Sequence, residues 1–206
     1  MAITTYAELK TAIANWLNRD DLTDRIPEFI TMAEANLNRD LRHYKMVERV
    51  DATLDSRYVQ LPNNWVETLR FSITSTPTYR LELASLDDML EFRENTSDTS
   101  GIPRYYAHVG ESIEVYPTPD AERTMQLTYY EEIPALSDSN TYNWLLQDAP
   151  DVYLYGSLVH SAPFLLDDAR LGTWANLYAT ALSSLQASSD RTRFAGSGLR
   201  MRVKSY

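Results

Sequence analysis

The sequence predicts an α+β protein in which helices from both ends of the chain form a bundle and an antiparallel β region is inserted between them. Three observations predict this fold. Apolar residues recur at helical spacing near both ends, they alternate with polar residues in the middle, and glycines separate the last helix from an extended end. The predicted parts are an N-terminal helix pair (1–45), a β subdomain with one short helix (46–134), C-terminal helices that complete the bundle (135–194) and an extended basic C-terminal arm (195–206).

The first helix is predicted to begin after Thr5, whose hydroxyl can cap it, with Glu8 completing a capping box. One apolar face runs along this helix at the spacing i, i+3, i+4 and i+7. Its residues are Tyr6, Leu9, Ile13, Trp16 and Leu17.

A polar break precedes a second helix, for which Asp24 is the predicted cap and Pro27 lies in the first turn. We expect its buried side to carry Ile30, Ala33, Leu37 and Leu41, and its polar side to carry Glu34, Asn38 and Arg42. Neither helix can bury its stripe alone, so both are expected to pack on the long C-terminal helix, with everything between as an insertion.

The middle of the chain predicts six or seven strands, as a small sandwich or a curled sheet. A turn at 56–57 is expected to return the first strand on itself through 58–61. Gly110-Glu111 suits a type II′ hairpin turn. One short helix interrupts the strands, with Ser85 as its cap.

Two helices are predicted after the β region. The first, 151–166, is apolar on most sides, and Pro163 kinks or ends it. The second, 168–189, carries an apolar stripe formed by Leu171, Trp174, Leu177, Tyr178, Ala181, Leu182 and Leu185.

Composition and motifs argue against an enzyme. The chain has no cysteine, no glycine-rich phosphate loop and no known hydrolase or metalloprotease motif. His43, His108 and His160 fall on separate predicted elements, with His108 on a polar strand face, and the acidic pairs lack the spacing of a calcium loop. We therefore predict no catalytic residue, no cofactor and no metal, in a soluble chain that is neither secreted nor inserted in a membrane.

The net charge of −10 is distributed unevenly. Residues 191–206 hold five basic side chains and no acidic one, so residues 1–190 carry a net charge of −15. This acidic body argues against general nucleic-acid binding. In the arm, Leu199, Met201 and Val203 alternate with Arg200, Arg202 and Lys204, as in a strand with one apolar and one basic face. Such an arm can add to a sheet edge of a partner, fold back on its own β region, or remain solvated.

Tyrosine is abundant, with 14 residues, five of them in the second half of the β region. Tyrosine is enriched at protein interfaces, although some of these rings must fill the core. We predict Tyr106, Tyr116 and Tyr130 as interface candidates, and carbohydrate stacking is an alternative use.

Three stretches carry a further signal. They are the opening Tyr6-x-x-Leu9-x-x-x-Ile13-x-x-Trp16-Leu17-Asn18-Arg19-x-Asp21 with Ile26-Pro27-x-Phe29-Ile30-x-x-Ala33-Glu34-x-x-Leu37-x-Arg39-x-Leu41-Arg42, the turn Leu61-Pro62-x-x-Trp65, and the ending Gly196-Ser197-Gly198-Leu199-Arg200-Met201-Arg202. Together they resemble the head-to-tail adaptor (connector) proteins of tailed bacteriophages over nearly the whole chain.

This resemblance implies a virion protein of the neck, assembled in the host cytoplasm, that forms a homo-oligomeric ring, commonly of twelve subunits. It implies the portal protein and the next tail component as partners, duplex DNA that passes through the ring without specific binding, and no catalytic residues. Residues 199–204 are then the predicted portal-docking arm. Two alternatives stay open: another neck or tail component such as a nozzle, tube or fibre-attachment protein, and an enzyme with an unrecognised carboxylate site.

Overall fold

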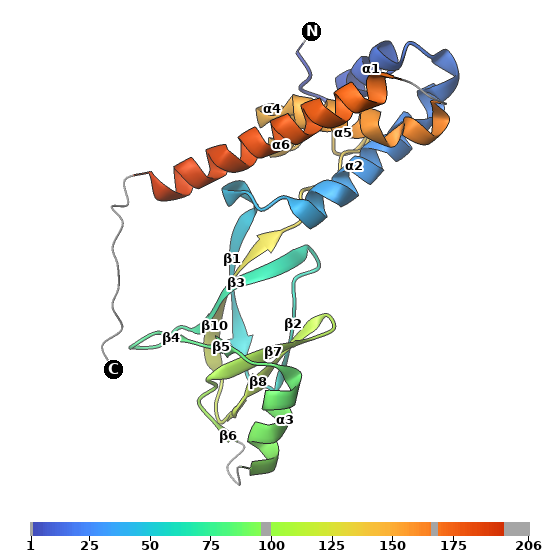
Figure 1. The fold of residues 1–206 in the computed structure, drawn as a ribbon. Coiled ribbons are helices and arrows are strands. Elements are labelled where there is room, and N and C mark those ends of the chain that lie inside the picture. The colour runs from blue at the N-terminus through green and yellow to red at the C-terminus, as the bar shows by residue number, and fades with distance from the viewer. Residues whose placement is uncertain (1, 96–99, 166–168, 196–206) are drawn as a thin grey trace. The chain divides into compact units, whose positions relative to one another are not determined.

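A computed structural model of the chain describes residues 2–95, 100–165 and 169–195 (Figure 1). The chain divides into two compact units, a helical unit built from both ends (Met1–Met46 with Ile133–Tyr206) and a β unit from the middle (Val47–Glu132). Helices and mainly antiparallel sheets confirm the predicted α+β class. The predicted C-terminal arm lies outside the described residues.

The helical unit is organised around α5 (Pro150–His160), and not around the long C-terminal helix as predicted. Helix α5 contacts the other four helices of the unit. These are α1 (Tyr6–Leu17), α2 (Ile26–Asp40), α4 (Trp144–Asp148) and α6 (Arg170–Phe194), with 3₁₀ turns at Asp20–Arg25, Tyr44–Met46 and Ala162–Phe164. On α5, Val152, Tyr153 and Leu158 are completely buried. Gly156 allows the close approach of α6, because a Cβ atom there would lie 3.1 Å from the Tyr178 ring.

The start of α1 confirms the capping box. The Glu8 N–H donates to the Thr5 hydroxyl (3.3 Å), and the Thr5 N–H donates to the Glu8 carboxylate (3.0 Å). The prediction that Trp16 belongs to the buried stripe is wrong. It lies on the flank of the stripe and is exposed, with its ring edge-on to Tyr155 at 5.7 Å.

Three other helix boundaries differ from the predictions. Asp24 is not the cap of α2, because residues 20–25 form a 3₁₀ turn that runs directly into Ile26. Helix α5 stops at His160, before Pro163. Helix α6 continues to Phe194, and Trp174 and Leu185 are the only residues of its predicted stripe that are fully buried.

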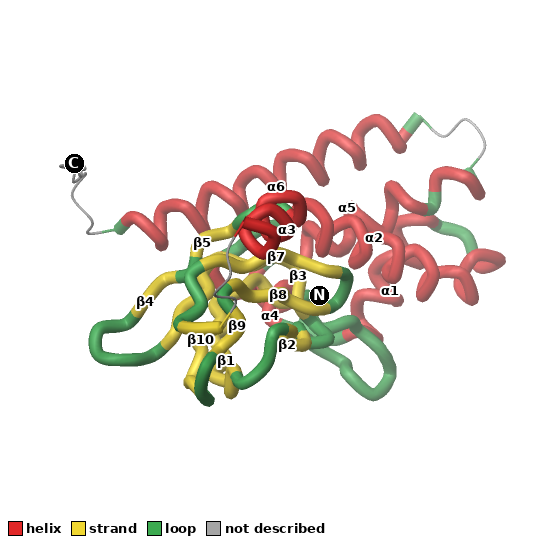
Figure 2. The backbone as a smooth tube through the Cα atoms, turned by 90° about the horizontal axis from the view of Figure 1, so that it is seen from below, coloured by secondary structure: helices red, strands yellow, loops and turns green. Residues whose placement is uncertain are grey.

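The β unit holds two four-stranded sheets (Figure 2). In the first sheet the order is β1 (Val47–Leu54), β10 (Arg123–Glu131), β3 (Trp65–Ile73) and β4 (Tyr79–Arg80). In the second sheet the order is β2 (Tyr58–Gln60), β8 (Ser112–Tyr116), β7 (Tyr105–Val109) and β5 (Glu82–Leu83). A separate pair joins β6 (Ser100–Gly101) to β9 (Thr118–Pro119), and the helix is α3 (Leu86–Asn95).

Apolar side chains from both sheets form one core. The register aligns Val50 with Leu127 and Leu127 with Phe71, so these residues share a face of the first sheet. The second sheet contributes Tyr106, Ile113 and Val115 to the same cluster.

Strand pairing differs from the prediction in two ways. Strand β2 does not return along β1 but pairs with β8 in the second sheet, while β1 pairs with β10. Two of the pairs, β5–β7 and β6–β9, are parallel. Both differences arise from long-range partners, which a local turn pattern does not specify.

The hairpin at Gly110 is confirmed. Val109 pairs with Ser112, which leaves two residues in the turn, and Gly110 has a φ of 60°. A positive φ at the first turn residue alone is the signature of a type II′ turn.

Candidate functional site

Across residues 2–95, 100–165 and 169–195, no group of three or more His, Cys, Asp or Glu side chains could hold a metal ion. None of the helices in these ranges is long and apolar enough to cross a membrane.

Each histidine has a structural setting. The His43 ring stacks on Trp144 with 4.9 Å between centroids, and its Nδ1 accepts the Lys45 N–H (3.3 Å). His160 Nε2 lies 2.7 Å from the Asn36 side-chain nitrogen. Burial lowers the pKa of all three histidines. The prediction of a polar face for His108 is wrong, because its ring packs on Trp65 with 5.0 Å between centroids.

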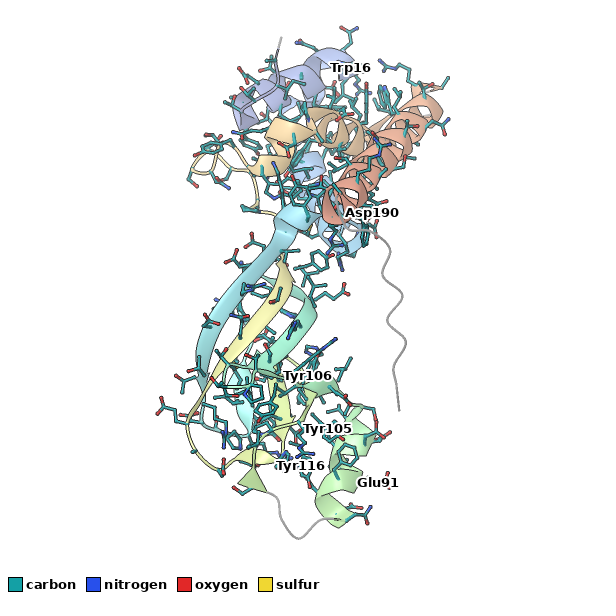
Figure 3. The ribbon with its side chains drawn as sticks, turned by 90° about the vertical axis from the view of Figure 1, so that its left-hand side faces the viewer. Trp16, Glu91, Tyr105, Tyr106, Tyr116 and Asp190 are labelled. Atoms are coloured by element: carbon teal, nitrogen blue, oxygen red, sulfur yellow. The ribbon has the colours of Figure 1, made fainter. Side chains whose placement is uncertain are left out.

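The tyrosines predicted as interface candidates are buried, and Figure 3 labels two of them, Tyr106 and Tyr116, in the β unit. The exposed fractions of Tyr106, Tyr116 and Tyr130 are 6%, 6% and 4%. The Tyr106 ring packs edge-on against Phe71 at 5.4 Å, and the Tyr116 hydroxyl donates to the carbonyl of Phe92 (2.9 Å). The prediction that these rings are exposed is therefore wrong.

Tyr106 and Tyr116 are buried because both faces of the second sheet are covered, whereas Tyr130 lies on β10 of the first sheet. One face packs in the core between the sheets, and α3 covers the other, where Met89 and Phe92 contact Ala107 and Tyr116. On a strand covered on both faces, alternation does not separate buried from exposed residues. Residues 199–204, predicted as a docking arm, lie outside the described residues.

One buried polar network in the helical unit escaped the sequence analysis. Glu34, predicted on a polar face, is buried and accepts the Leu136 N–H (2.8 Å) and the Tyr153 hydroxyl (3.2 Å). Asn143 donates to that hydroxyl (2.7 Å) and to the carbonyl of Pro134 (2.8 Å). The network ties the segment after the β unit to α2 and α5.

Burial dominates the electrostatics of this network. Burial raises the pKa of the Glu34 carboxyl, although both of its hydrogen bonds oppose the shift. Burial also raises the pKa of Tyr153, and the nearby Glu34 adds to this effect. A signal was present in the sequence, because Glu34 lies four residues after Ile30 and three before Leu37, on the apolar stripe itself.

A second buried carboxylate organises the β unit. Glu114 on β8 accepts hydrogen bonds from Arg57 (2.8 Å) and from Arg93 on α3 (3.1 Å). Arg93 also donates to the carbonyl of Val115 (3.0 Å), so the single basic side chain of α3 is turned toward the sheet. This arrangement fixes which side of α3 faces outward.

We expect Glu114→Gln to lower the free energy of unfolding of the β unit by about 1–3 kcal/mol, because two guanidinium groups lose a charged acceptor. Urea unfolding measures the change. Glu111→Gln, on the exposed hairpin turn, is the matched control, with an expected change of at most about 0.5 kcal/mol. Equal stability of the two variants would contradict the assigned role of Glu114.

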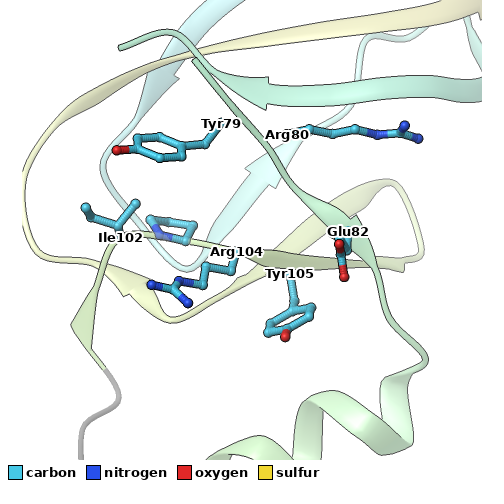
Figure 4. Close-up of a pocket in the computed structure, with 7 residues that line it drawn as sticks. Tyr79, Arg80, Glu82, Ile102, Arg104 and Tyr105 are labelled. Carbon is cyan, nitrogen blue, oxygen red and sulfur yellow. The ribbon is translucent and has the colours of Figure 1, made fainter. Parts of the chain in front are cut away.

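The β unit also has an open groove of about 350 Å³ (Figure 4). It is lined by Tyr79, Arg80, Glu82, Ile102, Pro103, Arg104 and Tyr105. Figure 4 shows the Tyr79 ring above Ile102, with the Arg104 and Tyr105 side chains next to each other below them. The groove has no arrangement of nucleophile and base, and its mixture of arginine, tyrosine and apolar side chains is typical of a protein interface.

Comparison with known proteins assigns the family. The family model described as "SU10 adaptor protein" matches residues 4–202, which is nearly the whole chain. No curated protein matches the chain. The matched range includes residues of both compact units. The chain therefore belongs to the SU10 adaptor protein family and is a structural adaptor protein of a bacteriophage.

Proposed function

We propose that this adaptor assembles as a homo-oligomeric ring, of twelve subunits, in the neck of the virion. The ring joins the portal protein to the next tail component and continues the channel through which DNA leaves the head. The observation that carries the proposal is the family match over residues 4–202, because it includes both the helical unit and the β unit.

The chemistry of the chain is compatible with a purely structural role. Its buried polar groups serve the fold, as the networks of Glu34 and Glu114 illustrate. Large apolar side chains remain exposed on both units, among them Trp16, Met32, Leu83 and Leu90. Exposed apolar surface of this kind is available for contacts within an assembly.

We assign the contact with the portal to the basic arm, residues 199–204. Its alternating apolar and basic side chains suit a strand that adds to the edge of a sheet on the portal, where backbone hydrogen bonds give affinity and side-chain pockets give register.

Mixing purified portal with this protein tests the proposed function. We expect a complex of portal and adaptor in size-exclusion chromatography with light scattering, and a ring under the portal by electron microscopy. The adaptor alone, at the same concentration, is the control for self-assembly. Absence of a complex at high concentration of both proteins would contradict the proposal.

The acidic body gives a second expected result. With a net charge of −15 over residues 1–190, the protein repels the phosphates of DNA that traverses the ring. We expect no retention of duplex DNA in a filter-binding assay at about 0.1 M salt, where charges interact over roughly 10 Å. Tight retention that weakens steeply as salt increases would contradict a channel that releases DNA.

A further inference from the structure

Helix α3 presents an acidic and apolar face that the rest of the β unit does not cover. Met89 is the one fully buried residue of this helix, and Arg93 is turned toward Glu114. Their positions on the helical wheel place Asp87, Glu91 and Glu94 on the opposite side. In the described structure these three carboxylates make no hydrogen bond or ion pair.

Leucines border these carboxylates. Leu86 and Leu90 are one turn apart on α3, with exposed fractions of 47% and 56%, and Leu83, just before the helix, is 64% exposed. We refer to Leu83, Leu86, Asp87, Leu90, Glu91 and Glu94 as the α3 ridge. Two of these exposed leucines share one helix face and the third lies just before it, and apolar surface rimmed by charge is typical of a docking site.

The groove shown in Figure 4 has the opposite character. Its walls are the edge strands of the two sheets, β4 and β5, and the segment 102–105 opposite them. Tyr79 and Ile102 give it an apolar floor, and both are exposed. Neither the Arg80 nor the Arg104 guanidinium has a hydrogen bond or an ion pair with any described residue.

The two surfaces are complementary in charge. The ridge offers three carboxylates beside leucines, and the groove offers Arg80 and Arg104 beside Tyr79 and Ile102, with Glu82 as the single acidic side chain of its lining. Arginine binds carboxylate through two parallel hydrogen bonds, and it is enriched with tyrosine in interfaces. A contact from the ridge of one copy to the groove of the next, repeated in one direction, is heterologous, and heterologous contacts generate rings where the rotation closes.

We propose that the α3 ridge of one copy docks into the Tyr79–Arg104 groove of a second copy, with Glu91 and Glu94 facing the two arginines and Leu90 lying near Ile102. This inference rests on the proposed ring and names the contact that joins its β units. Pairing of these surfaces also explains why an acidic protein keeps two unpaired arginines in one hollow.

Cysteine cross-linking tests the contact directly, because the natural chain has no cysteine. Two single-cysteine proteins, L90C and I102C, are made with tags of different size, mixed and oxidised. We expect the L90C–I102C heterodimer to exceed either homodimer by at least tenfold. L90C mixed with R49C, on the exposed face of β1, is the matched control and should show no such preference.

Charge reversal gives an independent readout. Glu91→Arg and Arg104→Glu should each reduce assembly of the full chain at least tenfold, and the double variant should recover it. Glu111→Arg and Arg49→Glu, exposed residues outside both surfaces, serve as controls that should assemble like the natural protein.

The outcomes separate the alternatives. Cross-linking without preference would overturn the proposal. A further single-cysteine protein, M201C in the basic arm, would overturn it if it cross-linked to L90C in preference to I102C. A double variant that does not recover assembly would also overturn it. A strong L90C–I102C heterodimer together with no portal complex would leave this contact standing and contradict the proposed function instead.

Discussion

Deletion of residues 196–206 is expected to abolish binding to the portal while leaving the melting temperature of the adaptor nearly unchanged. Every buried core residue of the described structure lies before this segment, so we expect both cores to form without it. The affinity of an added strand comes from its own backbone hydrogen bonds and alternating side chains, so removing the segment removes the whole contact. Ordering such a segment costs roughly 1–2 kcal/mol per residue, and only the bound state repays that cost.

Differential scanning calorimetry and a portal pull-down measure the two effects. Two triple variants of unchanged chain length separate the faces of the arm. One carries Arg200→Glu, Arg202→Glu and Lys204→Glu on the basic face. The other carries Leu199→Ser, Met201→Ser and Val203→Ser on the apolar face. Loss of portal binding in both variants indicates that both faces of the strand contact the portal. A truncated protein that still fills the neck of infectious particles would rule out the arm as the docking element.

Glu34→Ala is expected to destabilise the helical unit by about 3–5 kcal/mol, the largest effect of any single substitution considered for this chain. The change leaves the buried Leu136 N–H and the Tyr153 hydroxyl without their acceptor and opens a cavity between α2 and α5. Urea unfolding followed by helical circular dichroism measures the loss. Glu28→Ala, on the exposed first turn of α2, is the matched control.

Glu34→Gln separates shape from charge. The amide oxygen can still accept, so we expect a smaller loss of stability than for alanine, and the pH dependence that Glu34 gives to the stability should disappear. Burial raises the pKa of Glu34 in the folded protein above its ordinary value of 4.5. The folded state therefore holds this proton more tightly, and the stability that Glu34 contributes is full below pH 4.5 and falls as the pH rises through the folded pKa.

The stability of the Gln variant relative to the natural protein should accordingly increase between about pH 4 and about pH 7, since the amide does not titrate. Unfolding curves at the two pH values give this difference. A relative stability that decreases over the same interval would contradict the assignment of a raised pKa to a buried Glu34 carboxyl.

The elements that the sequence alone determined are those set by neighbours in the chain. The capping box of Thr5 and Glu8, the cap at Ser85 and the hairpin at Gly110 all depend on residues within four positions of one another. Helical and alternating periodicity likewise reports which face of an element is apolar, so the α+β class was predictable.

Tertiary structure decided the features that depend on distant partners. Strand β2 pairs with β8, more than fifty residues away, because the apolar faces of the sheet set the pairing of its strands and the local turn sequence does not. Tyr106 is buried in the core between the two sheets, and Tyr116, on the other face of the second sheet, is buried because α3 covers that face. Glu34 is buried because Leu136 and Tyr153, about a hundred residues later, supply donors that compensate for its lost hydration. A local pattern records that a side chain is polar, whereas only packing determines whether water or another part of the chain satisfies it.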